Sequence, residues 1–109
     1  MIDKLEALLA AGQDSAGLRF ALAGQYLKTG DAVHAVEHGE VAVLLDPNYS
    51  AAWRLLGQAQ VAADKPEDAA QSFERGIAVA KASGDRQVEK EMQVFLRRLQ
   101  KSDPRTDRS

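Results

Sequence analysis

Apolar residues recur along most of the chain at steps of three and four, which is the spacing of one face of an α-helix. The pattern is clearest in 51–63, where Trp53, Leu56 and Ala63 share a side with Ala59 or Gln60. Comparable runs cover 2–11, 16–28, 32–45 and 66–80. A last run carries a one-sided apolar stripe made of Val88, Met92, Phe95, Leu96 and Leu99. The periodicity therefore predicts six helices and an all-α fold.

Helix-breaking residues separate these runs. Pro47 ends one helix, Pro66 suits the first turn of another, and Gly84 suits the left-handed backbone that ends a helix. The stretch 81–85 is predicted to be a linker. Short polar side chains stand where helices should begin, and the expected caps are Asp14 or Ser15, Asp31, Asn48 or Ser50, and Asp85.

The helical runs repeat with a fixed period. Ala35 and Ala69 lie 34 residues apart, and so do Leu22 and Leu56, as well as Ala23 and Gly57. Small residues are needed where two antiparallel helices cross closely, so Gly57 and Ala69 are predicted to mark such a crossing. The large residues Trp53, Leu56 and Phe73 are predicted to form the core, with stacking of Trp53 on a ligand as the alternative.

The stretch 46–76 resembles a tetratricopeptide repeat (TPR) unit, because Pro47, Trp53, Leu56, Gly57, Ala69 and Phe73 have the family's spacings. The resemblance to small two-repeat bacterial TPR proteins covers about 16–81, and several slots differ between the units. Arg19 stands in the tryptophan slot of the first unit, Gln60 in the tyrosine slot of the second, and Gly39 in the slot that Phe73 fills.

This resemblance implies antiparallel helix pairs that stack into a short right-handed α-solenoid. We expect a single helical domain over 1–101, with repeats at about 16–48 and 49–82. A capping helix is expected at about 85–101, because the last pair otherwise exposes its stacking face. Residues 102–109 are polar and contain Pro104, so this tail is expected to be disordered.

The resemblance also implies a function. The first helix of each TPR unit lines a concave groove that binds a protein or a peptide, so the chain is expected to be a non-catalytic adaptor or scaffold. Carried over, the groove residues are Phe20, Gly24, Leu27, Arg54, Gln58, Val61, Arg86 and Lys90. One end of that groove is apolar and the other basic, so the partner is expected to combine an acidic segment with apolar anchors.

Two alternatives stay open for this surface. Its charges can serve only as a solubilising face. The chain can also have a structural role, as a self-associating protein or a permanent subunit of a larger assembly, because two units are fewer than the three usually needed for stability.

One local string suggests chemistry. His34, Glu37 and His38 match the H-x-x-E-H pattern of one class of zinc peptidases, and two histidines four apart on a helix can share a metal. However, the string lies inside the first repeat with Ala35 at the helix crossing, which places both histidines on the outer helix face. We therefore expect no catalysis and no metal site, with adventitious metal binding by the exposed pair as the alternative.

Composition narrows the remaining classes. The chain has 109 residues, no cysteine, a net charge of −2 and a pI of about 5.6. These values fit one domain without disulfides and give no electrostatic case for nucleic acid. Apolar runs are too short for a membrane span, and Asp3 and Glu6 argue against a signal peptide. We expect a cytoplasmic monomer or weak homo-oligomer without a cofactor and without a membrane partner.

Overall fold

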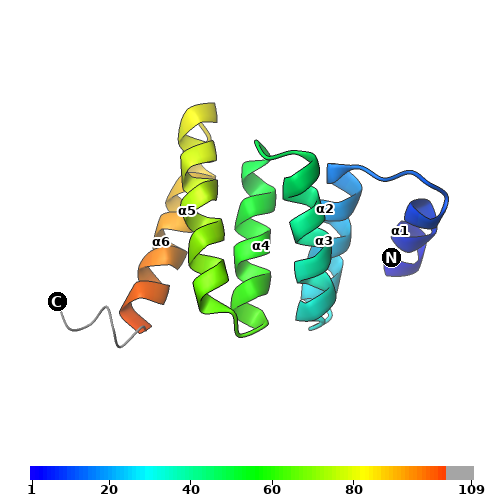
Figure 1. Cartoon of the computed structure of the whole chain (residues 1–109), viewed down its shortest axis with the longest axis horizontal. Helices are drawn as coiled ribbons and strands as arrows, with labels where there is room; N and C mark the ends of the chain where they lie inside the picture. The colour runs from blue at the N-terminus through cyan, green and yellow to red at the C-terminus, as the bar shows by residue number, and fades with distance from the viewer. Residues whose placement is uncertain (103–109) are drawn as a thin grey trace.

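The computed structural model describes residues 1–102, which form six helices that stand side by side (Figure 1). In chain order they are α1 (Ile2–Ala10), α2 (Ala16–Lys28), α3 (Ala32–Leu45), α4 (Ser50–Ala62), α5 (Pro66–Ser83) and α6 (Arg86–Ser102). The described residues contain no strand, so the predicted all-α fold is confirmed.

The helices form two layers. In the inner layer α2 contacts α4, and α4 contacts α6. The outer layer consists of α1, α3 and α5, whose backbones do not pack against one another within residues 1–102. Because the inner helices approach one another more closely than the outer ones, the array curves toward the inner layer. The inner layer is therefore the concave side.

The core lies between the layers. Phe73, Leu22 and Met92 are its largest fully buried side chains, and burying such a side chain stabilises the fold by about 1.5–3 kcal/mol. The predicted crossing of α4 and α5 is tight, since a Cβ atom at Gly57 would overlap the ring of Phe73. Ala69 is also fully buried, as the repeat pattern predicts.

Some of the predicted N-terminal helix caps are confirmed and one is not. Ser15 accepts a hydrogen bond from the Leu18 amide at 3.1 Å, and Asp31 accepts one from the His34 amide at 3.2 Å. The prediction of Asn48 or Ser50 as a cap for α4 is wrong. Tyr49 occupies that position without a side-chain bond, and the Ser50 hydroxyl instead donates to Asp85 Oδ2 at 2.9 Å. That bond joins the start of α4 to the start of α6.

The linker before α6 is shorter than the sequence suggests. Helix α5 continues to Ser83, and Gly84 ends it with a left-handed φ of 76°. The prediction of a linker over the whole of 81–85 is therefore wrong, because only Gly84 and Asp85 separate α5 from α6.

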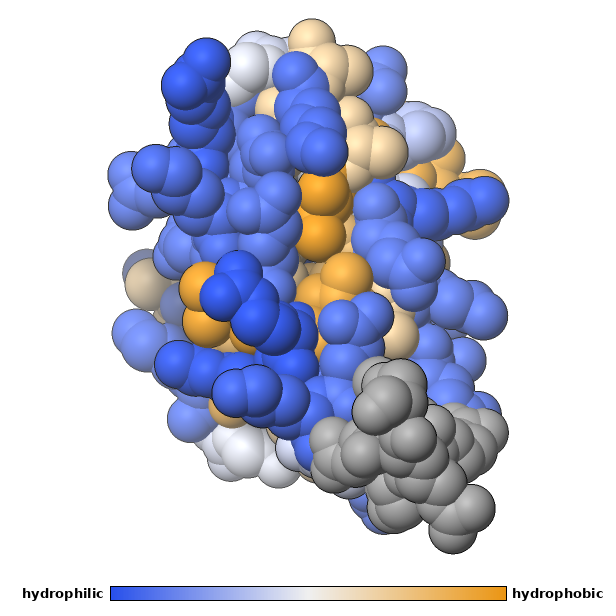
Figure 2. Space-filling model, turned by 90° about the vertical axis from the view of Figure 1, so that its left-hand side faces the viewer, coloured by the Kyte–Doolittle hydropathy of each residue, from blue (hydrophilic) through white to orange (hydrophobic). Residues whose placement is uncertain are grey.

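Helix α6 covers the end of the array, as a capping helix should. Met92 is fully buried, and it fills the space that a side chain at Gly76 would need. Phe95 packs on Phe73 with ring centroids 5.5 Å apart. Figure 2 views the molecule from the side of α5 and α6, where polar side chains cover most of the surface and apolar residues show as a central strip and a few smaller areas. A polar outer face is what a terminal helix of a repeat array needs.

The predicted divisions of the chain stay predictions. The pair α2 and α3 falls inside the expected repeat 16–48, while α4 and α5 extend over 50–83 against the expected 49–82. Of the expected tail, Ser102 belongs to α6, and 103–109 lie outside the described residues. No helix in residues 1–102 is both long enough and apolar enough to cross a membrane.

Candidate functional site

The apolar end of the expected groove lies between α2 and α4. A Cβ atom built at Gly24 would contact Leu55 Cδ2 at 3.8 Å, so Gly24 faces α4. Phe20 is half-buried and packs on Tyr49, with ring centroids 5.0 Å apart. Leu27 is also half-buried against the core. This end of the inner face is thus largely occupied by the protein's own side chains.

Arg54 is paired within the chain. Its Nη1 atom donates to Glu91 Oε1 of α6 at 2.7 Å. Both side chains are partly exposed, so the pair contributes little stability, about 0–1 kcal/mol. It nevertheless neutralises the positive charge that the sequence assigns to this part of the groove, and it joins α6 to α4.

Gln58 and Val61 line an open cavity of about 360 Å³ between α4 and α6. The residues across it are Phe95, Arg98, Leu99 and Ser102 of α6, with Phe73 of α5 at the base. Val61 is 46% exposed although it is apolar. The cavity thus combines an apolar interior with one positive charge, that of Arg98, and it lies where α4 and α6 both end.

Arg86 and Lys90 are not brought together with Arg54. They line a different cavity, with Lys81 and Gly84 at the end of α5. Glu91 is the α6 residue that reaches Arg54, and Lys90 is turned from it by about 100° around the helix axis. The structure therefore does not bring Arg86 and Lys90 to the side of α6 that meets Arg54. Arg98 is the positive charge that the structure puts beside Val61.

The histidine string is not an exposed pair. His34 is exposed and contacts Asp31 Oδ2 through Nδ1 at 2.7 Å. His38 is only 7% exposed, which overturns the expectation that both rings face outward. Its ring stacks on Tyr26 with centroids 5.5 Å apart, and Glu6 of α1 lies 3.7 Å from its Nε2 atom. The expectation fails because α1 packs beside this part of the first repeat.

The hydrogen bond of His38 to Arg19 indicates the tautomer of the neutral ring. Arg19 Nη1 lies 3.0 Å from His38 Nδ1, and because a guanidinium can only donate, Nδ1 must be the acceptor. The neutral ring therefore carries its proton on Nε2, directed toward Glu6. Burial lowers the pKa of His38, and the charge of Arg19 lowers it further. Nδ1 is thus occupied by Arg19, whereas Nε2 lies 3.7 Å from Glu6 Oε1, which is beyond hydrogen-bond distance.

Arg19 itself is held by Asp14. The guanidinium donates to the two Asp14 carboxylate oxygens at 2.8 and 3.0 Å, a bidentate geometry that is among the strongest side-chain pairings. This contact lowers the pKa of Asp14. Asp14, Arg19, His38 and Glu6 thus form a continuous polar chain, which we call the first-repeat cluster together with Tyr26. Within residues 1–102, no three His, Cys, Asp or Glu side chains are placed to hold a metal ion.

The sequence alone did not point to Glu91 or Arg98. The sequence does hold a signal for Glu91. This residue stands one position before Met92, next to the apolar stripe of α6, and so it lies on the side that faces the neighbouring helix. Arg98 follows Phe95 by three residues, which places the two on one side of the helix. The sides of α6 on which Glu91 and Arg98 lie depend on where this helix begins. The position of the preceding linker sets that start.

Comparisons with known proteins point to one family. No family model matches the chain. A TPR repeat-containing protein of Pseudomonas aeruginosa is 51% identical over 102 residues, which is 94% of this chain and 97% of that protein. The solution structure of a protein from Bordetella parapertussis is 42% identical with a TM-score of 0.81, covering 94% of this chain and 90% of that one.

A second group of solved structures adds the repeat fold. The crystal structure of a tetratricopeptide repeat domain protein from Salinibacter ruber is 28% identical with a TM-score of 0.76, and the match covers 83% of this chain and 100% of that one. The 34-residue period, the stacked helix pairs and these relatives agree. The chain belongs to the tetratricopeptide repeat family.

Proposed function

We propose that this protein is a non-catalytic adaptor that holds a segment of a partner protein on its inner face, at the cavity between α4 and α6. The observation that carries the proposal is the exposed apolar surface of Val61 inside that cavity, opposite Phe95 and Leu99. Exposed apolar surface in a recess is typical of a binding site. Membership of a helical repeat family that serves protein interaction points the same way.

The charge at the cavity defines the partner further. Arg98 lies at the cavity and Arg54 is neutralised by Glu91. The partner segment should therefore place an apolar side chain beside Val61 and an acidic residue next to Arg98. The apolar contact would supply most of the affinity, and the charge would mainly set association rate and specificity. A cytoplasmic location is part of the proposal, since a chain without cysteine does not depend on an oxidising compartment.

The test begins with a partner captured from the source cell and continues with purified components. Val61→Glu should abolish binding, because it puts a charge into the apolar interior of the cavity. Val33→Glu is the matched control, since Val33 is 64% exposed on α3 and lies outside the cavity. Equal loss of binding in both variants, or no loss in Val61→Glu, would contradict the proposal.

A structural role in self-association is distinguished by the same proteins. Light scattering over a range of concentrations measures the mass of the free chain. If the mass doubles and Val61→Glu restores a monomer, the inner face is a contact between copies rather than a site for another protein.

A further inference from the structure

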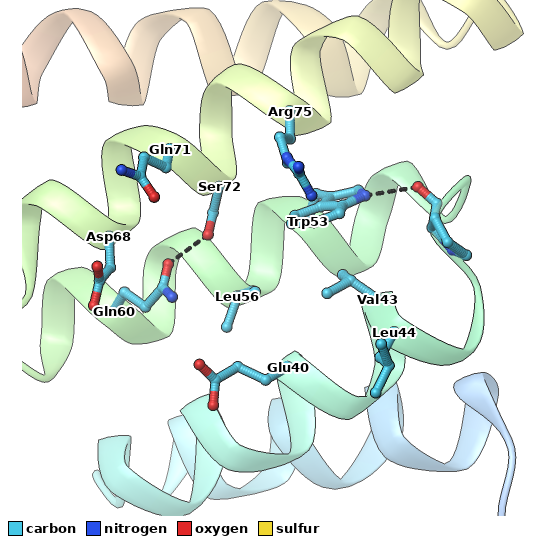
Figure 3. A pocket seen from close by; sticks show the side chains of 11 residues that line it. Glu40, Val43, Leu44, Trp53, Leu56, Gln60, Asp68, Gln71, Ser72 and Arg75 are labelled. Atoms are coloured by element: carbon cyan, nitrogen blue, oxygen red, sulfur yellow. Dashed lines mark hydrogen bonds between the residues drawn. The ribbon is translucent and has the colours of Figure 1, made fainter.

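A second cavity opens on the outer face of the molecule, away from the proposed partner site. It has a volume of about 530 Å³ and lies between α3 and α5, with α4 as its floor (Figure 3). We call it the outer groove and define it by Glu40 and Leu44 of α3, Trp53 and Gln60 of α4, and Asp68 and Arg75 of α5. The groove is open because the backbones of α3 and α5 do not pack against each other within residues 1–102.

One end of the outer groove is an aromatic and apolar surface. The Trp53 indole Nε1 donates to the Pro47 carbonyl at 2.8 Å, which holds the ring in place. The Arg75 guanidinium lies 5.7 Å from the centre of that ring, a distance at which a cation is attracted to it. Leu44 stands beside this end and is largely exposed. Trp53 itself is only 8% exposed and belongs to the core, as the sequence predicts, so the apolar contact at this end comes mainly from Leu44 beside it.

The other end of the outer groove is acidic. Glu40 projects from α3 and Asp68 from α5, and Figure 3 shows them at the same end of the groove as Gln60. Neither carboxylate makes a hydrogen bond or an ion pair to another side chain in the described part of the chain. With Arg75 at the far end, the groove has opposite charges at its two ends, which would fix the direction of a bound segment.

Gln60 lies at the acidic end of the outer groove and offers a hydrogen-bond donor there. Gln60 is only 5% exposed, and its Oε1 atom accepts a hydrogen bond from Ser72 Oγ at 2.6 Å. Its Nε2 group has no acceptor within residues 1–102 and lies on the groove side (Figure 3). The Nε2 atom is not buried, so it reaches solvent and can donate to water in the free protein. A carbonyl oxygen of a bound peptide backbone would take the place of that water.

The equivalent space in the first repeat shows that this groove is specific to the second. The residues 34 positions before Gln60 and Ser72 are Tyr26 and His38, whose stacked rings fill the space between α1 and α3. Arg19 stands at the position that corresponds to Trp53 and hydrogen-bonds His38. The backbone arrangement is shared, so the smaller pair Gln60 and Ser72 leaves the second space open.

We propose that the outer groove is a second protein-binding site, which takes an extended segment with an apolar residue and an arginine or lysine. The apolar side chain lies on Leu44 next to Trp53, a backbone carbonyl accepts from Gln60 Nε2, and the basic side chain reaches Glu40 and Asp68. This site is independent of the inner-face cavity, so the protein could hold two partner segments on opposite faces.

The test uses synthetic peptides and the fluorescence of Trp53, the one tryptophan in the chain. The peptides are short, capped at both ends, and carry one leucine and one arginine in a glycine–serine background, in both orders and at several spacings. Matched peptides have glutamate in place of arginine. At least one arginine peptide should change the Trp53 emission saturably, and its glutamate counterpart should bind at least about tenfold more weakly.

Variants of the protein locate the peptide. Glu40→Gln combined with Asp68→Asn keeps the shape of the groove and should weaken binding about tenfold or more. Glu37→Gln combined with Glu74→Gln is the matched control, because both residues are exposed on the same two helices outside the groove. Gln60→Tyr combined with Ser72→His should close the groove with the pair that fills the first repeat, and should abolish binding. Val61→Glu should leave peptide binding unchanged.

Several results would overturn the proposal. One is the absence of a saturable emission change with every arginine peptide, and another is equal binding of the arginine and glutamate peptides. Loss of binding in Val61→Glu would place the peptide on the inner face instead. An emission change that appears with rising protein concentration alone, together with a doubled mass by light scattering, would make the occupant a second copy of the chain.

Discussion

The two spaces between neighbouring outer helices occupy the same place in the repeat and have opposite contents. Between α1 and α3, Tyr26 stacks on the buried His38, and Arg19 binds that ring. Between α3 and α5 the corresponding residues leave an open groove above Trp53. Two side-chain pairs on one backbone arrangement thus decide whether a space is part of the interior or part of the surface.

The two helix pairs also differ in the size of the side chains where their helices cross. Gly57 faces the large ring of Phe73 in the second pair, whereas the first pair has Ala23 and Gly39 at these two positions. The second repeat therefore has its large side chain, Phe73, between its own two helices. The first repeat has its large side chains, Tyr26 and His38, on the side that faces α1. The family pattern is completed by the two repeats together rather than by either one.

The largest effect should come from truncating that bulk. Phe73→Ala removes a fully buried ring that contacts Phe95 as well as Gly57, and such truncations cost about 3–5 kcal/mol. Denaturant unfolding followed by circular dichroism measures the loss. A cost below about 1 kcal/mol would mean that the second repeat does not depend on this ring. It would then contradict the view that Phe73 and Gly39, at corresponding positions, make the two repeats pack differently.

Removing the central ring of the first-repeat cluster should have the next largest effect. His38→Ala takes away a buried ring together with the acceptor of Arg19 Nη1, although Arg19 keeps its contact to Asp14, and this should cost about 1–3 kcal/mol. His34→Ala is the control, because His34 is exposed, and exposed substitutions usually stay within about 0.5 kcal/mol. Equal effects of the two substitutions on the unfolding midpoint would contradict the buried placement of His38.

A smaller effect is expected at the glycine crossing. Gly57→Ala forces a methyl group against the Phe73 ring, and overpacking costs about 1–3 kcal/mol, part of which the better helix propensity of alanine offsets. In a Phe73→Leu background the same substitution should cost less. A double-mutant cycle measures this coupling, and strict additivity would show that the two residues do not meet.

The pH dependence of stability should carry the smallest signal. Because burial lowers the pKa of His38 in the folded state, the unfolded chain binds a proton more readily just below the ordinary value of about 6.5. Stability from this site is therefore complete above about pH 6.5 and is lost as the pH falls through the folded-state pKa. The wild type should lose stability between about pH 7 and pH 5 more steeply than His38→Gln. Parallel curves would place His38 in water.

The helices and their pairing could be predicted from the sequence because they depend on local periodicity. Apolar spacing, Pro47, Pro66 and Gly84 located the elements, and the 34-residue recurrence located the Gly57 crossing. These signals arise within one helix or between two adjacent ones, where steric rules act over a few residues.

The contents of the surfaces could not be predicted, because they depend on helix rotation and on distant neighbours. The end of α5 at Ser83 sets the rotation of α6, so Glu91 rather than Lys90 reaches Arg54. His38 is buried by packing around the first repeat, where Glu6 of α1 approaches it, and no pattern around His38 reveals that contact. The outer groove is open because Gln60 and Ser72 are smaller than Tyr26 and His38, the corresponding residues of the first repeat.

We propose that the inner face between α4 and α6 holds a partner protein. The most direct test is an amide NMR titration of the labelled chain with the captured partner. We expect the largest shift changes at Gln58, Val61, Phe95 and Arg98, with little change at Val33 or His34. Changes confined to residues of α1 and α3, with Val61 and Phe95 unaffected, would contradict it.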